Sequence, residues 1–269
     1  MNRSDPEFGQ TPLLSPARAR PWLAVLAFSL LLGFYVRFGV WWVPIVFIGY
    51  ACFVVFAERR LPTELLGGAL APRDLAVGVL LGAMCIAPAL GVVLLQGYDV
   101  RYSLGWVLVA QAIPSALAAL AEEPLFRGLA LRYFELRLGS GLALLLSSGL
   151  FGLMHITSSL NPFVWILQAM IGLAFGAAYL VTRRLWLPIA LHACINFTTS
   201  FVMNSASWHS SGSVLAFLGR LMITIVILVV AVRRRSFVGP DAAWTAQVVP
   251  SRAGERASSQ RPLSPTGAI

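Results

Sequence analysis

The sequence contains no lysine, and all 20 of its basic residues are arginine. Charged residues of both signs make up only 12% of the chain. Soluble domains are normally about 25% charged, so this composition excludes an ordinary water-soluble globular protein. The absence of lysine also suggests a GC-rich genome, and we therefore expect a bacterial protein.

Several structural and catalytic motifs are missing as well. The three cysteines (Cys52, Cys85 and Cys194) lie in apolar stretches without a C-x-x-C pair, which excludes a disulfide framework. No H-E-x-x-H zinc motif occurs, because ITSS follows His155 and ACIN follows His192. The apolar runs lack the two aspartates of an aspartyl intramembrane protease and the G-x-S-G turn of a rhomboid-type serine protease. A metal held by two histidines and a glutamate from separate helices remains open.

Long apolar runs dominate what is present. Apolar residues make up 58% of the chain, and its mean hydropathy is +0.79. Runs of roughly 17–25 residues recur, which is the length needed to cross a bilayer. We therefore predict an all-α membrane protein, a polytopic bundle of about eight transmembrane helices forming one domain over residues 21–233. The predicted helices are residues 21–36, 40–57, 75–96, 105–136, 140–158, 163–182, 186–203 and 214–232.

The arginines are distributed unevenly between the two sides of this domain. With the N-terminus inside, the inner segments carry twelve arginines and the outer segments three. The inner ones are Arg18, Arg20, Arg59, Arg60, Arg73, Arg132, Arg137, Arg183, Arg184, Arg233, Arg234 and Arg235, and the outer ones are Arg37, Arg101 and Arg220. Because cytoplasmic loops are enriched in basic residues, we predict a multi-pass protein of the inner (plasma) membrane with both termini in the cytoplasm.

The two ends of the chain differ from the apolar region between them. Residues 1–20 and 234–269 are polar and rich in proline, without apolar periodicity, and we expect disordered cytoplasmic tails. The net charge of +9 is spread over these tails and the short loops, so no nucleic-acid partner is expected. The sequence shows no internal repeat, and a transporter built from inverted repeats gains no support.

A few ionisable residues lie where apolar residues are expected. Glu122 and Glu123 are about 17 residues into the fourth predicted helix, or roughly 26 Å at 1.5 Å per residue. His155 and His192 also lie inside predicted helices. Ionisable residues inside the membrane are costly and usually functional, so these four residues are candidates for a site.

Helical spacing suggests how these residues are arranged. Glu123 and Arg127 are one turn apart, which suits an ion pair, whereas Glu122 projects about 100° away. Pro124 removes a backbone hydrogen bond and should bend the helix beside the two glutamates. The pair Glu123–Arg127 on its own is also compatible with a purely structural role.

A second set of one-turn spacings lies on later helices. Phe151 and His155 share one helix face, and His192 and Asn196 share another, where both can face one cavity. Each of these residues alone could simply hydrogen-bond a neighbouring helix. Together with Glu122 they provide a general base for water and hydrogen-bond donors for an oxyanion, which suits amide hydrolysis inside the membrane.

Three short motifs carry a resemblance to a known family. E-E-P-L-F-R (residues 122–127), F-G-L-M-H (151–155) and H-A-C-I-N (192–196) resemble the motifs E-E-x-x-x-R, F-x-x-x-H and H-x-x-x-N of the CPBP family. This family is also called the ABI or CAAX-protease-like family and includes the type II CAAX prenyl endopeptidase. The resemblance covers residues 104–201 and implies an eight-helix bundle with an intramembrane cavity open toward the cytosol and the membrane.

The resemblance also implies roles for these residues. Glu122 would be the general base for water and His155 its partner, while His192 and Asn196 would form the oxyanion site. The family is described as glutamate-dependent and metal-independent, so neither a metal nor another cofactor is expected.

The remaining motif residues would have supporting roles. Glu123 and Arg127 would fix the helix, and Phe151 would line the cavity. The implied activity is that of an intramembrane endopeptidase, whose partners are the lipid bilayer and a membrane-associated or lipidated peptide. The alternatives are a catalytically idle member of the fold, acting as a membrane scaffold or bacteriocin-immunity factor, and an ion- or proton-coupled transporter.

Overall fold

The computed structural model describes residues 21–59, 61–66, 68–95, 104–204, 210–234 and 236–239. Within these ranges the chain is helical and contains no strand, which confirms the all-α prediction. Four segments of the described chain are long and apolar enough to span a membrane: Pro21–Phe38, Val40–Ala57, Val109–Met154 and Pro162–Thr182. Eight spans remain a prediction. The predicted tail over residues 1–20 and most of the predicted C-terminal tail lie outside the described residues.

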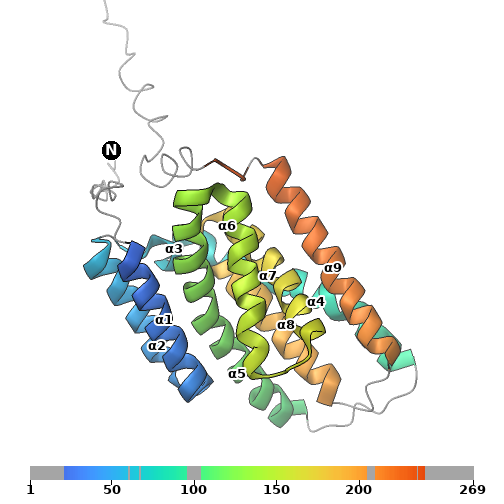
Figure 1. Ribbon diagram of the computed structural model, residues 1–269. Helices are drawn as coiled ribbons and strands as arrows, with labels where there is room; N and C mark the ends of the chain where they lie inside the picture. Colours follow the sequence, from blue (N-terminus) through green and yellow to red (C-terminus); the bar gives the residue numbers. More distant parts are fainter. Residues whose placement is uncertain are drawn as a thin grey trace, which may run out of the picture.

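The first two predicted helices form a tight hairpin, drawn in blue in Figure 1. The first is α1 (Pro21–Phe38), and the second consists of η1 (Val40–Trp42), α2 (Val43–Cys52) and η2 (Phe53–Ala57). Gly39 separates them with a φ of 79°, a backbone conformation that suits glycine. This hairpin brings residues close to the N-terminus against the later helices of the bundle.

A long bent helix forms the centre of the molecule. It consists of α5 (Leu104–Glu123), η4 (Pro124–Leu131) and α6 (Arg132–Met154). The bend expected at Pro124 takes the form of π-type turns, which begin at this proline. Gly139 has non-helical angles of φ 74° and ψ 168°, so the chain reverses there. This confirms the predicted division between the fourth and fifth apolar helices.

The remaining helices close the bundle. η5 (His155–Thr157) leads into α7 (Pro162–Thr182), whose first turn is capped by the side chain of Asn161. α3 (Thr63–Leu66) and η3 (Gly68–Leu70) precede α4 (Ala71–Leu95), which packs against α8 (Trp186–Asn204) and α9 (Ser210–Arg233). The fifth predicted helix ends earlier than expected, at Met154, so that His155 lies in a short 3-10 turn.

Glycines allow α4 to approach both of its neighbours closely. A Cβ added at Gly78 would lie 2.7 Å from the carbonyl oxygen of Leu187 in α8. A Cβ added at Gly219 of α9 would lie 1.9 Å from the carbonyl oxygen of Cys85. The backbones of these helices therefore touch at positions where no larger residue fits.

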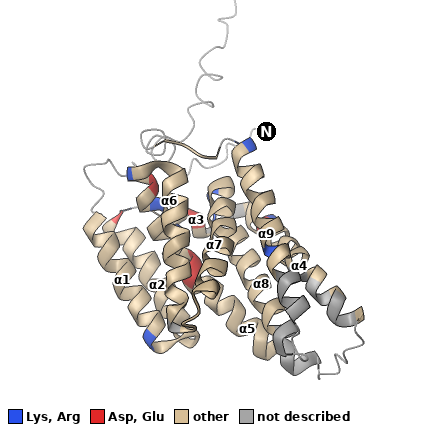
Figure 2. Cartoon of the chain, turned by 45° about the vertical axis from the view of Figure 1, so that its right-hand side comes forward, with Lys and Arg blue, Asp and Glu red and all other residues tan. Residues whose placement is uncertain are grey.

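One end of the bundle carries a set of ion pairs. Arg132 pairs with Glu58 and Glu64, Arg183 pairs with Glu135 at 2.5 Å, and Arg184 pairs with Asp74 at 2.5 Å. We call these seven residues and the end that they occupy the ion-pair face. Pro21 and Arg233, where the first and last helices meet the tails, lie at the same end (Figures 1 and 2).

Several arginines that the sequence analysis interpreted only as topology signals form ion pairs at this face. Arg132, Arg183 and Arg184 were all counted among the arginines of the predicted inner segments, and each links two segments distant in the sequence. The start of the predicted C-terminal tail is attached here too, because Val238 and Ser140 exchange two hydrogen bonds of 2.9 and 3.0 Å. These three arginines therefore also hold the helix ends together.

Candidate functional site

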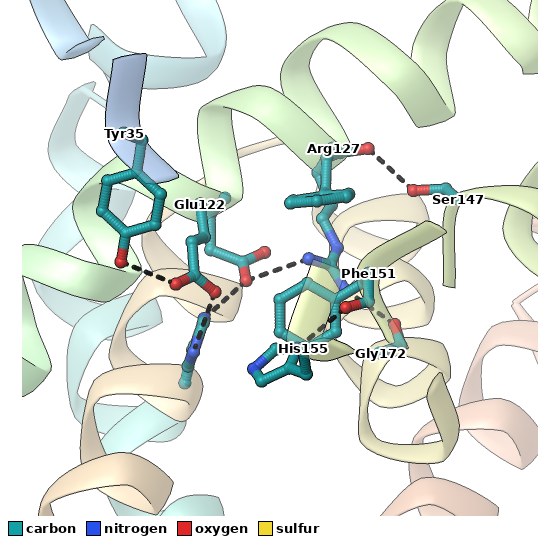
Figure 3. A network of polar contacts seen from close by, with 10 residues as sticks. Tyr35, Glu122, Arg127, Ser147, Phe151, His155 and Gly172 are labelled. Carbon is teal, nitrogen blue, oxygen red and sulfur yellow. Dashed lines mark hydrogen bonds and ion pairs between the residues drawn. The ribbon is translucent and has the colours of Figure 1, made fainter. Parts of the chain in front are cut away.

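The predicted ion pair between Glu123 and Arg127 forms the centre of the candidate site. The two side chains are 3.1 Å apart, and neither is exposed at all. Arg127 also donates a 2.9 Å hydrogen bond to the carbonyl oxygen of Gly172 in α7 (Figure 3). One guanidinium thus links the long bent helix to α7 in the interior of the bundle.

Three aromatic rings surround this buried guanidinium. Its central carbon lies 4.8 Å from the ring centre of Phe151, 5.3 Å from that of Phe175 and 5.9 Å from that of Phe126. The negative face of an aromatic ring attracts a cation, most strongly where water is excluded. The rings and the carboxylate together offset the cost of burying the charge of Arg127.

Glu123 has a second partner that its position in the sequence does not reveal. Its Oε1 atom lies 2.8 Å from Nδ1 of His192 in α8. A carboxylate oxygen in an ion pair accepts hydrogen bonds, so Nδ1 of His192 is the donor in this contact. The ring of His192 also stacks on Phe175, with the centres 4.6 Å apart. Glu123 therefore fixes both the orientation and the tautomer of His192.

Glu122 points away from the ion pair, as the helical spacing predicts. Its Oε1 accepts a 2.8 Å hydrogen bond from the hydroxyl of Tyr35 in α1 (Figure 3). Its Oε2 is buried without a hydrogen-bond partner in the described part of the chain and lies 3.8 Å from Nε2 of His192. One carboxylate oxygen is thus occupied, and the other faces an imidazole nitrogen.

Tyr35 is a site residue that the sequence analysis missed. It lies in the first helix, 87 residues before Glu122, and has no motif around it. Its side chain is only 8% exposed, although α1 is otherwise largely exposed. The only available signal was a tyrosine hydroxyl in an apolar helix, which is a weak one because such hydroxyls often bond to a neighbouring helix.

His155 lies near the other candidates but makes a different contact. Its Nδ1 is 2.9 Å from the carbonyl oxygen of Phe151. A carbonyl oxygen only accepts, so Nδ1 donates, and Nε2 of the neutral ring is left as an acceptor. No hydrogen bond or ion pair joins His155 to Glu122, although both are described. The expected pairing of these two residues is therefore not a direct contact here.

Phe151 separates the two histidines. Its ring is edge-on to His155, with the centres 5.1 Å apart, and to His192 at 5.6 Å. The resemblance implies that Phe151 lines the cavity, but the side chain is only 1% exposed and lies behind the cavity wall. Its position beside both imidazoles and Arg127 makes it a spacer that sets their separation.

His155, His192 and Asn196 border one cavity of about 290 Å³. Asn196 lies one turn beyond His192 on α8, as predicted, and Gln111, Gln168 and Arg220 also line the cavity. Glu122 is not part of the lining; its free oxygen is adjacent to His192, which is. Liquid water occupies about 30 Å³ per molecule, so the cavity has room for several waters or for a short piece of peptide.

The cavity extends from His192, in the first half of α8, toward His155 at the end of the bundle opposite the ion-pair face. α6 starts at that face with Arg132 and reaches His155 at its far end, and α7 returns from there to Arg183 (Figure 1). With the chain ends in the cytosol, as the arginines predict, the His155 end of the cavity lies toward the outer side of the membrane. The resemblance implies a cavity open toward the cytosol and the membrane, and the side to which this cavity opens stays a prediction.

Arg220 is a second residue that the sequence analysis did not place in the site. It was counted among the outer arginines, but the structure puts it on the cavity wall. One of its terminal nitrogens donates a 2.9 Å hydrogen bond to the hydroxyl of Thr199, and its Nε is buried without a hydrogen-bond partner among the described residues. The cavity therefore contains a cation that no described carboxylate neutralises.

The described residues do not arrange a metal site. No group of three or more histidine, cysteine, aspartate or glutamate side chains in this part of the chain is placed to hold a metal ion. The two nitrogens of His192 face the two glutamates, and the Nδ1 proton of His192 is directed at Glu123.

Comparison with known proteins supports the resemblance. A family model described as "Type II CAAX prenyl endopeptidase Rce1-like" matches residues 104–198, and the chain therefore carries an Rce1-like type II CAAX prenyl endopeptidase domain over this segment. The matched segment runs from the start of α5 into α8 and includes all three motifs, but neither Tyr35 nor Arg220. Searches of the curated proteins and of the solved structures found no match.

The buried pair generates a prediction about stability. Changing Arg127→Met should lower the free energy of unfolding by about 3–5 kcal/mol, because it leaves the carboxylate of Glu123 buried without its cation. The double variant Glu123→Gln/Arg127→Met should recover part of this loss. The measurement is equilibrium unfolding in detergent micelles, with Arg137→Met as the control for an exposed arginine. If the loss of unfolding free energy in the double variant equals the sum of the losses in the two single variants, the pair is not coupled.

Proposed function

We propose that this protein is an intramembrane endopeptidase that hydrolyses a peptide bond in a membrane-associated or lipidated peptide, using water activated by Glu122. The observation that carries this proposal is the buried free Oε2 of Glu122, 3.8 Å from Nε2 of a histidine that lines a polar cavity. The Rce1-like domain over the same segment supports a protease of this class.

The proposed reaction begins with a water molecule beside Glu122. Oε2 takes a proton from the water as the water oxygen attacks the carbonyl carbon of the peptide. Tyr35 holds Oε1, so that the carboxylate presents its other oxygen to the water. The proton then passes to the amide nitrogen of the leaving group, and the C–N bond breaks.

His192 takes part as a proton partner of Glu122 in this scheme. Its Nε2 is an acceptor while Nδ1 donates to Glu123, so Nε2 can receive the proton from Glu122. The carboxylate of Glu123 stabilises the resulting imidazolium, as a buried carboxylate does for the histidine of a serine-protease triad. The protonated Nε2 and the amide of Asn196 then donate to the oxyanion, and the proton on Nε2 finally passes to the amide nitrogen of the leaving group.

His155 has a separate part in the proposed reaction. Its Nδ1 donates to Phe151, so its Nε2 accepts hydrogen bonds from the cavity side. An acceptor at this position orients a water or a substrate N–H, which replaces the direct pairing with Glu122 expected from the motif. In this proposal His192 is the proton partner and His155 is the acceptor.

A cleavage assay tests the proposed activity. The purified chain in proteoliposomes is incubated with lipidated peptides, including a prenylated peptide with a CAAX ending, and products are mapped by mass spectrometry. Glu122→Gln should reduce the cleavage rate at least about 100-fold, because a general base contributes about 10²–10⁴-fold. Glu135→Gln is the matched control, a buried carboxylate on the ion-pair face. Unchanged cleavage by the Glu122→Gln variant would contradict the mechanism. Loss of wild-type cleavage when a chelator is added would indicate that a metal takes part.

The orientation in the membrane is a further part of the proposal. We place the chain ends in the cytoplasm of a bacterial cell and the His155 end of the cavity toward the outer side of the plasma membrane. In a variant without the native cysteines, Leu160→Cys should react with a membrane-impermeant maleimide in intact cells, whereas Arg137→Cys should react only after permeabilisation. Leu160 is 83% exposed at the far end of the bundle. The opposite labelling pattern would show that the chain ends lie outside.

The unneutralised cation in the cavity predicts a substrate preference. We expect Arg220 to bind an anionic group of the peptide, either an acidic side chain or a free C-terminal carboxylate. Arg220→Gln should raise KM about tenfold or more for a peptide with such a group, since a charge-assisted hydrogen bond contributes about 1.5–3 kcal/mol. Its amidated or uncharged counterpart should be unaffected. An equal change in KM for both peptides would contradict this role.

A further inference from the structure

A second cavity, of about 460 Å³, lies at the ion-pair face between α4, α7, α8 and α9. Its lining combines two kinds of residue. Arg73, Arg184 and Arg234 form a basic rim, while Val77 and Val230 belong to apolar walls that lead into the bundle. Basic residues are visible at the upper end of α9 in Figure 2. The cavity is thus charged at one end and apolar along its depth.

The basic rim has more positive charge than its own acid can neutralise. Asp74 lines the cavity too, but it is held by Arg184 through two hydrogen bonds of 2.5 and 2.9 Å. Arg73 and Arg234 are exposed, and no described side chain pairs with either. Three arginines against one aspartate leave two positive charges at the mouth of the cavity.

The apolar part is a crevice between α4 and α9. The two helices touch at Cys85 and Gly219, where a Cβ on the glycine would meet the carbonyl oxygen at 1.9 Å. Nearer the ion-pair face, Val77 of α4 is 38% exposed and Val230 of α9 is 39% exposed, although both line the cavity. Eight residues separate Val77 from the contact at Cys85, which is about 12 Å along the helix. The crevice is therefore closed at its base and open at the ion-pair face.

We propose that this cavity binds an anionic phospholipid from the leaflet at the ion-pair face. Its phosphate would lie between Arg73 and Arg234, and the first part of an acyl chain would fill the crevice beside Val77 and Val230. Guanidinium groups match phosphate oxygens in pairs. Basic pockets between transmembrane helices are a known form of anionic-lipid site. The apolar crevice distinguishes a lipid from a free anion, which would leave these walls in contact with water.

The site is separate from the candidate catalytic residues. The two cavities share no lining residue, and the basic rim lies at the opposite end of the bundle from His155. A bound lipid would bridge α4 and α9 beside the ion-pair face. The lipid would therefore act on the stability of this helix pair, whether or not the protein cleaves peptides.

The test is binding and thermal unfolding of the full chain in detergent micelles with added lipid. Phosphatidylglycerol should raise the unfolding temperature and remain bound in native mass spectrometry, whereas phosphatidylcholine should do neither. Arg73→Gln and Arg234→Gln should each weaken phosphatidylglycerol binding about fivefold, because a basic residue near an anionic membrane contributes about 1 kcal/mol. Arg137→Gln, on the same end of the bundle but outside the cavity, should keep the wild-type affinity.

Further measurements distinguish a phospholipid from a free anion. Glycerol phosphate carries the head group without acyl chains and should not raise the unfolding temperature; an equal rise would overturn the lipid assignment. Val77→Trp should fill the crevice and abolish the phosphatidylglycerol effect while both arginines remain. Equal binding of phosphatidylcholine, or unchanged phosphatidylglycerol binding in the double variant Arg73→Gln/Arg234→Gln, would overturn the proposal. Unfolding of each variant without lipid shows that it is folded.

Discussion

The rest of the candidate site depends on a guanidinium buried in the centre of an apolar bundle. Arg127 is fully buried, and an isolated charge in such a place would cost several kcal/mol. The structure offsets this cost with Glu123, a backbone carbonyl of α7 and three aromatic rings. Glu123, held in place by Arg127, accepts the hydrogen bond from Nδ1 of His192. The orientation of His192 therefore follows from an ion pair that does not itself face the cavity.

This arrangement gives the two adjacent glutamates different environments. Each carboxylate keeps its Oε2 without a hydrogen-bond partner among the described residues. The Oε1 of Glu123 accepts from a cation and an imidazole, whereas the Oε1 of Glu122 accepts from the neutral hydroxyl of Tyr35. The free oxygen of Glu122 faces Nε2 of His192 at 3.8 Å, which suits the role of base proposed for Glu122. The helical offset between neighbouring residues separates a supporting carboxylate from a reactive one within a single dipeptide.

The sequence predicted these features to the extent that they are local. The Glu123–Arg127 pair, the bend at Pro124 and the shared face of His192 and Asn196 follow from helical spacing, and the structure has all three. Contacts between distant helices could not be predicted this way. The bond from Tyr35 to Glu122 spans 87 residues, and the place of Arg220 on the cavity wall depends on how α9 packs. The count of arginines on each side predicted an orientation, but it could not predict the ion pairs that several of these arginines make.

The central claim is that Glu123 holds His192 with a proton on Nδ1 and a bare Nε2 toward Glu122. The most direct test is the ¹⁵N NMR spectrum of the imidazole of His192 in lipid bilayers, assigned by replacing the chain's two other histidines. The account predicts a neutral ring protonated on Nδ1 in the wild type and loss of this preference in Glu123→Gln. A ring protonated on Nε2 alone, or a tautomer unaffected by Glu123→Gln, would contradict it.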